Sequence, residues 1–163
     1  MAKRICLYGI LSAACIVLSF VEHLISLDFI APGVKLGLAN SVALMLLVYG
    51  DIKGAFSVNI VRIILSGLLF SSPFAIIYSL SGGILSLVVM TVMLKFRQVG
   101  IFGISIMGAT VHNLAQLLCA SVFLSGSVWY YSPILLISSV ICGSLTAVIS
   151  KSVLKKYKNI KIS

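Results

Sequence analysis

The sequence predicts an all-α integral membrane protein with six transmembrane helices and with both termini in the cytoplasm. The chain is 61% hydrophobic and only 9% charged, whereas a soluble domain uses roughly 25% charged residues to cover its surface. Its apolar residues form long runs, and a spanning helix needs roughly 20 such residues. The basic residues stand between and beyond these runs, as the loops of a membrane protein require.

The first three helices are expected where apolar runs follow basic or turn-forming residues. The first run follows Lys3 and Arg4. It also resembles a signal peptide, but no small-residue cleavage site precedes Glu22, so we expect it to remain as a helix. The second run is short and can begin in the turn at 32–33, and the third begins after Lys53.

The last three helices are separated by turn residues and charges. A Ser-Ser-Pro sequence at 71–73 separates the third run from the fourth, which ends at Lys95 and Arg97. Polar residues at 125–127 end the fifth, and an aromatic triplet at 129–131 suits the lipid boundary before the sixth. We expect one transmembrane domain over 1–163, with a basic tail at 151–163 and helices at about 5–22, 35–50, 54–70, 74–94, 101–124 and 132–150.

The orientation follows from the distribution of positive charge. With the N-terminus inside, Lys35 is the one basic loop residue expected outside. The cytoplasmic loops and tail then hold Lys3, Arg4, Lys53, Lys95, Arg97, Lys151, Lys155, Lys156, Lys158 and Lys161. Cytoplasmic loops carry such an excess of Lys and Arg. We therefore predict a multi-pass protein of the plasma membrane.

Several polar side chains fall inside the apolar runs and need a reason to be there. An ionisable group at the centre of a spanning helix costs about 2.5–3.5 kcal/mol on insertion scales, so such groups usually face a bundle interior. On the predicted topology they share the outer half of the bundle, where they can form a small-molecule site. We predict ligand-binding residues Lys35, Asn40, Arg62, His112, Asn113 and Gln116, with Glu22, Pro32 and Gly33 at the mouth.

Each of these residues also has a purely structural interpretation. Arg62 can bond to backbone carbonyls or extend to the membrane surface, and His112 can be a hydrogen-bonded core histidine. Asn113 and Gln116 can join helices by hydrogen bonds. Glu22 can form an ordinary boundary pair with the lysine that follows the 32–33 turn. If the site exists, the planar guanidinium of Arg62 suits a ligand with an anionic group and an apolar or aromatic body.

The motifs of most enzymes are absent from the sequence. There is no GxxxxGK[ST] loop, so the chain cannot bind ATP in the P-loop manner. The three acidic residues, Glu22, Asp28 and Asp51, are too far apart for a carboxylate pair or an aspartate-rich magnesium site. The four cysteines are widely spaced in apolar runs, which is typical of packing residues. We expect no catalysis, no metal, no cofactor and no nucleic-acid partner.

Two pairs of small residues predict close helix packing. Gly9 and Ala13 form such a pair in the first helix, and Gly82 and Gly83 lie in the fourth. Small residues let helix backbones approach closely, either within the chain or against a partner helix. Packing within the chain is the favoured interpretation of both pairs.

Three segments are distinctive: Pro32-Gly33-Val34-Lys35-Leu36-Gly37-Leu38-Ala39-Asn40, Ser81-Gly82-Gly83 and Gly108-Ala109-Thr110-Val111-His112-Asn113-Leu114-Ala115-Gln116, with Arg62 between the first two. Together they resemble the Gx transporter family, historically labelled "heptaprenyl diphosphate synthase component I". The resemblance covers nearly the whole chain. It implies a six-helix S component of an energy-coupling factor transporter, which binds a vitamin, flavin, or isoprenoid- or quinone-related ligand on the outer side.

The resemblance also implies partners: a membrane coupling subunit and two cytoplasmic ATPases. S components often carry an AxxxA-type contact motif on the first helix, and the nearest match here is Gly9-xxx-Ala13. Two other functions stay open. The chain can be a non-catalytic accessory component in heptaprenyl diphosphate or quinone synthesis, or an assembly protein without a ligand.

Overall fold

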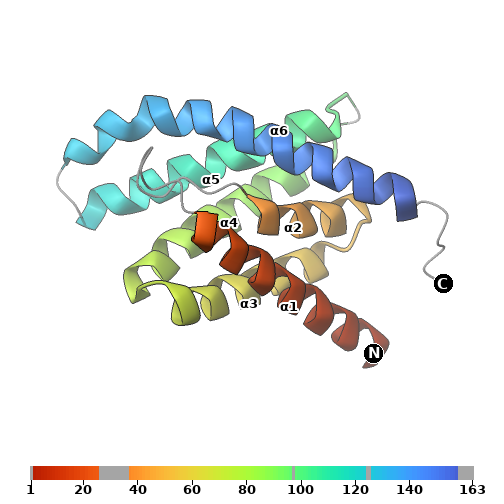
Figure 1. Ribbon diagram of the computed structural model, residues 1–163. Coiled ribbons are helices and arrows are strands. Elements are labelled where there is room, and N and C mark those ends of the chain that lie inside the picture. Colours follow the sequence, from red (N-terminus) through yellow and green to blue (C-terminus); the bar gives the residue numbers. More distant parts are fainter. Residues whose placement is uncertain (1, 26–36, 97, 124–125, 158–163) are drawn as a thin grey trace.

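The computed structural model describes residues 2–25, 37–96, 98–123 and 126–157. Every regular element in these ranges is a helix, so the all-α class is confirmed (Figure 1). The elements are α1 (Ala2–Ile25), α2 (Leu38–Val48), α3 (Ile52–Phe70), α4 (Pro73–Met93), α5 (Ile101–Phe123), the short 3₁₀ helix η1 (Gly126–Tyr131) and α6 (Ser132–Tyr157).

Five of the described helices are long and apolar enough to cross a membrane, and α2 is the shorter exception. With 11 residues, α2 is roughly 17 Å long, about half of the 30 Å thickness of a bilayer core. The helix expected at 35–50 is observed at Leu38–Val48. It is shorter than expected because Gly37, just before it, and Gly50, in the turn after it, have a positive φ. The structure supports a multi-pass membrane protein with five full-length helices and one short one.

Side-chain caps mark the starts of α3 and α4, at the turns before and after α3. The Asp51 carboxylate accepts a hydrogen bond from the backbone N–H of Gly54 at 2.9 Å, which satisfies a free donor of the first turn of α3. The hydroxyl of Tyr8 in α1 donates to the same carboxylate at 2.6 Å. Ser72 caps α4 in the same way, and Pro73 occupies its first turn, where the missing N–H of proline is not needed.

Helix α6 continues seven residues beyond its expected end, into the segment predicted to be a polar tail. Its last turn contains Lys155 and Lys156, and positive side chains favour the negative end of a helix dipole. The Lys151 ammonium lies 5.8 Å from the centre of the Phe102 ring in α5, within reach of a cation–π contact. These interactions explain why lysine-rich sequence extends the helix instead of ending it.

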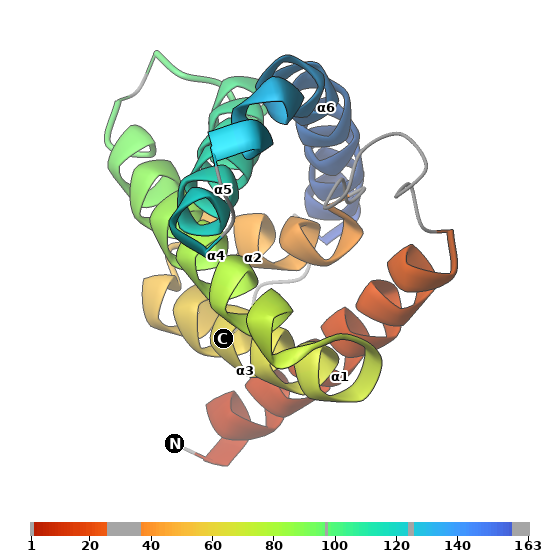
Figure 2. The same cartoon turned by 90° about the vertical axis from the view of Figure 1, so that its left-hand side faces the viewer.

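Helix α2 lies at the centre of the bundle, with the longer helices around it (Figure 2). It contacts α1, α3, α4 and α6, and most of its residues are buried, including Leu44 and Leu47. The surrounding helices expose many large apolar side chains on their outer faces. That distribution suits lipid as the solvent. The start of α1 and the end of α6 lie at the same end of the bundle (Figure 1).

The two predicted pairs of small residues differ in their surroundings. A Cβ on Gly82 would come within 2.8 Å of the His112 carbonyl oxygen in α5, and one on Gly83 within 2.6 Å of Ile63 Cδ1 in α3. This pair permits close packing of α4, as expected. A Cβ on Gly9 would meet nothing within 4 Å, and Ala13 is exposed. Among the described residues, the face of α1 that carries Gly9 and Ala13 therefore points outward and has no helix packed on it at Gly9, so contact with a partner helix stays a prediction.

Candidate functional site

A cavity of about 540 Å³ lies inside the bundle and is called the central cavity below. Its wall uses side chains from all six α-helices and from η1. The contributions of α1 and α3 come from their C-terminal halves, and that of α2 comes from Asn40 and Leu44. The α1 and α3 parts of the wall therefore lie toward the end of the bundle away from the start of α1 and the end of α6, whereas α4 and α5 line the cavity along most of their length.

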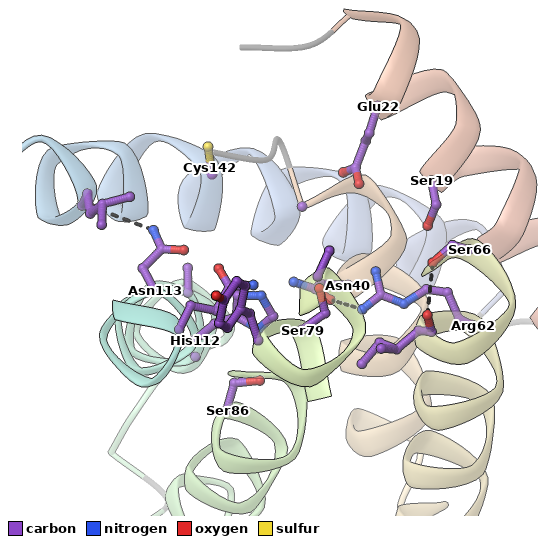
Figure 3. A pocket seen from close by; sticks show the side chains of 18 of the residues that line it. Ser19, Glu22, Asn40, Arg62, Ser66, Ser79, Ser86, His112, Asn113 and Cys142 are labelled. Atoms are coloured by element: carbon purple, nitrogen blue, oxygen red, sulfur yellow. Dashed lines mark hydrogen bonds between the residues drawn. The ribbon is translucent and has the colours of Figure 1, made fainter. Parts of the chain in front are cut away.

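The structure brings together six of the residues predicted for the site. The wall of the central cavity includes Glu22, Asn40, Arg62, His112, Asn113 and Gln116, which come from four helices. Several of them surround one space in the close view (Figure 3). Lys35, Pro32 and Gly33, predicted at the mouth or in the site, lie outside the described residues. Gly82 and Gly83 permit close packing of α4 against α5 and α3.

Arg62 is the most informative residue of this wall. Its side chain is only 8% exposed, so it does not extend to the membrane surface. Its Nη2 donates to Asn40 Oδ1 at 3.2 Å and to Asn59 Oδ1 at 2.9 Å. Within the described chain its buried Nε has no hydrogen-bond partner. Two neutral amides thus orient the guanidinium, that of Asn40 being visible beside it in Figure 3. The Glu22 carboxylate lines the same wall and interacts electrostatically with Arg62.

Glu22 connects α1 to the start of α2. Its carboxylate accepts a hydrogen bond from the backbone N–H of Leu38. Helix α2 needs this external acceptor because its own N-cap residue is Gly37, which has no capping side chain. On the opposite side, the Thr146 hydroxyl in α6 donates to the Gly37 carbonyl at 3.2 Å. The start of α2 is therefore held between α1 and α6, next to the central cavity.

Two of the predicted polar residues of α5, His112 and Asn113, have different surroundings. His112 is buried, at 9% exposure, with its backbone against Gly82 of α4. The amide nitrogen of Asn113 donates to the Leu135 carbonyl at 3.2 Å and to the Ser139 hydroxyl at 2.9 Å, both in α6. Asn113 therefore joins two helices, as its structural interpretation predicted, and also lines the cavity.

Sequence reasoning missed Asn59 and most of the small hydroxyl side chains. Asn59 is 3% exposed and orients Arg62 from one turn earlier in α3; an amide three residues before an intramembrane arginine could have indicated it. Serines give a weaker signal because their hydroxyls often bond to their own helix, as Ser86 does with the Gly83 carbonyl at 3.0 Å. Further polar wall residues are Ser19, His23, Ser66, Tyr78, Ser79, Ser105 and Thr146.

The central cavity has the properties of a binding site for a small organic molecule. Its volume lies within the roughly 300–1,000 Å³ typical of ligand pockets. Apolar side chains such as Leu44, Ile63 and Met90 share the wall with the polar groups. Within the described ranges, no group of three or more His, Cys, Asp or Glu residues is placed to hold a metal ion.

Comparison with known proteins identifies one related family. The model of the family described as "Heptaprenyl diphosphate synthase component I" matches residues 11–153. The match includes all six wall residues predicted from the sequence. Neither the curated proteins nor the solved structures that were compared contain a significant match to this chain.

Proposed function

The chain belongs to the heptaprenyl diphosphate synthase component I family, and from this starting point we propose that it binds a small organic ligand as the membrane subunit of an energy-coupling factor type transporter. The ligand carries an anionic group. A vitamin, a flavin, or an isoprenoid- or quinone-related compound fits this description. The role is binding and transport, with no catalytic step on this chain.

The observation that carries this proposal is the buried charge of Arg62 on the wall of the central cavity. Removing an arginine from water costs several kcal/mol, and neutral amides only partly repay that cost. An intramembrane ionisable residue facing a cavity marks a functional site by default. The guanidinium binds carboxylates and phosphates through charge-assisted hydrogen bonds. An anionic ligand would therefore bind directly to a guanidinium whose hydrogen-bond partners, Asn40 and Asn59, are neutral, and would add to the negative charge of Glu22 on the same wall.

The position of the cavity supports capture from outside the cell. Lys3 and Arg4 at the start of α1 and Lys155 and Lys156 at the end of α6 lie at the end of the bundle away from the α1 and α3 parts of the cavity wall. The positive-inside rule assigns that end to the cytoplasm. The wall residues of α1 and α3 then belong to the outer half of the membrane.

Transport needs partners, and the outer face of α1 suits one of them. Gly9 and Ala13 are exposed, and small residues favour contact between helices in a membrane. We assign this face to a membrane coupling subunit. The chain has no P-loop sequence, so separate cytoplasmic ATPases would supply the energy.

The family description favours a second candidate function. The chain would be a non-catalytic membrane component of heptaprenyl diphosphate synthesis and would bind a soluble synthase. The acidic residues Glu22, Asp28 and Asp51 form no aspartate-rich motif, so the magnesium-dependent step would belong to that partner. Affinity purification of the full-length protein separates the two functions. Recovery of ATPases and a membrane subunit supports transport, and recovery of a prenyl synthase alone supports the accessory role.

Mass spectrometry of small molecules tests the binding function directly. The full-length protein is purified gently in lipid nanodiscs and then denatured, and the released compounds are identified. We expect one compound with an acidic group at near-stoichiometric amounts. Arg62→Ala should lose it, whereas Lys53→Ala, which removes an exposed cation from the same helix, should retain it. Equal retention by Arg62→Ala would contradict the proposal.

A further inference from the structure

Resting on the binding function proposed above, we infer that the inner end of the central cavity holds an apolar chain of the ligand, about eight carbon atoms or two isoprene units long, while the anionic group lies at Arg62. We call this part of the cavity, which the topology above places nearest to the cytoplasm, the inner arm. Its wall consists of described residues from three helices, namely Leu44 in α2, Ser86 and Met90 in α4, and Ser105 and Gly108 in α5.

The inner arm begins at the level of Arg62, and two neighbouring glycines of α4 define this level. Asn59, which binds Arg62, packs against Gly83, because a Cβ there would come within 2.8 Å of the Asn59 amide nitrogen. His112 packs against the preceding residue, because a Cβ on Gly82 would come within 2.8 Å of the His112 carbonyl oxygen. The oriented guanidinium and His112 therefore lie at the same height along α4.

From this level the inner arm runs toward the cytoplasmic ends of α4 and α5. Met90 lies seven residues after Gly83, and Ser105 lies seven residues before His112. Each residue adds about 1.5 Å to a helix, so both helices give the arm a length of about 10 Å. Ser86 lies between its two ends along α4 (Figure 3). An extended chain advances about 1.2 Å per bond, so about eight bonds fill this length.

The hydroxyl groups of the inner arm leave no hydrogen for a ligand. Ser86 donates to the Gly83 carbonyl at 3.0 Å, and Ser105 donates to the Gly143 carbonyl in α6 at 2.7 Å. A hydroxyl has one hydrogen to donate, so a carboxylate, phosphate or carbonyl of the ligand would find no donor among the side chains that define the arm. Burying such a group without a hydrogen bond is costly. A hydrocarbon chain needs no donor and suits this wall.

Packed core closes the cytoplasmic end of the inner arm. A Cβ on Gly108 would come within 2.5 Å of the Met90 sulfur, so α4 and α5 approach closely there. Met90 and Leu44 also belong to a buried apolar cluster that continues with Leu47 and Ile104. The flexible thioether of methionine adapts to irregular neighbours, which suits the end of a chain. The position of this core sets how much of a chain the arm can hold.

Thiols at three positions act as a ruler for the chain. Ser79→Cys lies on the wall above the arm, Ser86→Cys lies partway along it, and Ser105→Cys lies at its end. The full-length protein in nanodiscs is treated with methyl methanethiosulfonate, and peptide mass spectrometry follows the modification at each position. The probes are butanoate, hexanoate, decanoate and geranate, a carboxylate with two isoprene units. Met90→Cys replaces the deepest reporter if Ser105→Cys does not fold.

We expect protection to reach deeper as the chain of the acid grows. At about ten times its Kd, decanoate should slow modification roughly tenfold at positions 79, 86 and 105, as mass action predicts. Hexanoate should protect positions 79 and 86, and butanoate position 79 alone. Arg62→Gln should abolish each effect, because the carboxylate loses its partner. Stronger protection of position 105 by geranate than by decanoate would support a prenyl chain, and the reverse would support a straight chain.

The control for partitioning of the acids into lipid is Ser121→Cys, on α5 outside the cavity wall, which should show no protection. Decanoate that protects position 105 no better than butanoate would overturn the inner arm as a chain site. If the acids still protect position 79 through Arg62, the binding function survives that result. Absence of any protection that depends on Arg62, at all three positions, would instead remove the basis of the binding function itself.

Discussion

At the scale of single residues, Asn59 decides how Arg62 is presented to the cavity. Its Oδ1 accepts from Arg62 Nη2 at 2.9 Å, and its side chain is almost completely buried. A hydrogen bond to a charged group contributes about 1.5–3 kcal/mol. Asn59 therefore acts as a positioning residue, because it orients the guanidinium without any need to touch a ligand.

Substitution of Asn59 tests this role. Asn59→Ala should weaken ligand retention by roughly tenfold to a hundredfold, the effect of losing one charge-assisted hydrogen bond. Arg62→Ala should remove retention completely. The measurement is the amount of released compound per protein, with the melting temperature recorded in parallel. Ser121→Ala, outside the cavity wall, is the control. Unchanged retention in Asn59→Ala would show that Arg62 does not depend on Asn59 for its orientation.

Asp51, at the start of α3 and away from the central cavity, should make the stability of the protein depend on pH. The hydrogen bond from Tyr8 lowers the pKa of this carboxyl below its ordinary value of 3.8, with a further lowering by the Gly54 N–H and an opposing effect of partial desolvation. Because the folded-state pKa is depressed, the stabilisation is present above 3.8 and is lost as the pH falls through the folded-state pKa. The protein should become less stable in this acidic range.

The check is the melting temperature of the purified protein between neutral pH and pH values below 3.8. Asp51→Asn cannot ionise and should have a lower melting temperature at neutral pH, with a flatter profile through the acidic range. Lys53→Ala, two residues away, should keep the slope of the unmodified protein. A profile of Asp51→Asn parallel to that of the unmodified protein would assign the acid sensitivity to another group.

At the scale of elements, close approach of helices limits which glycines can be replaced. Gly82 of α4 faces a backbone oxygen of α5, which cannot move without shifting the helix. Among the described residues, none lies within 4 Å of the position that a Cβ on Gly9 of α1 would take. The same substitution therefore has opposite expected effects in two helices, although both glycines lie in helix interiors.

Gly82→Ala should destabilise the protein by about 1–3 kcal/mol, the usual cost of adding volume to a packed interior. Gly9→Ala is the matched control and should be neutral or stabilising by up to about 1 kcal/mol, because alanine favours helices more than glycine does. Thermal unfolding in one detergent compares the two variants. A drop in melting temperature for Gly9→Ala as large as that for Gly82→Ala would mean that α1 is packed more tightly than described.

At the scale of the whole molecule, the bundle has two chemically different ends. Basic residues gather where α1 begins and α6 ends, and the α1 and α3 parts of the cavity wall lie toward the other end. The positive-inside rule then predicts the topology of the complete protein. A C-terminal tag should be protected from protease in intact cells. A membrane-impermeant maleimide should label Ser121→Cys, near the opposite end of α5, and digestion of the tag with no labelling would reverse the assignment.

Much of the fold follows from the linear order of residues because lipid imposes a simple rule. A segment that crosses the bilayer must be apolar and must satisfy its own backbone hydrogen bonds, so apolar runs predict helices. The start of α4 at Pro73 follows from local turn chemistry in the same way. The sequence also predicts that Arg62 and His112 face inward, because their exposure to lipid would be costly.

The remaining features depend on contacts between segments far apart in the chain. The start of α2 is held in place by Glu22 and Thr146, which bind the Leu38 N–H and the Gly37 carbonyl from α1 and α6. The orientation of Arg62 depends on Asn59 and on Asn40 in another helix. The sequence by itself determined the class of the protein and the polar residues of its interior, because both follow from the cost of placing each residue in lipid. Only the tertiary structure decided that these residues share one cavity and that the small residues of α1 face outward, because helix rotation and neighbour choice are set by packing.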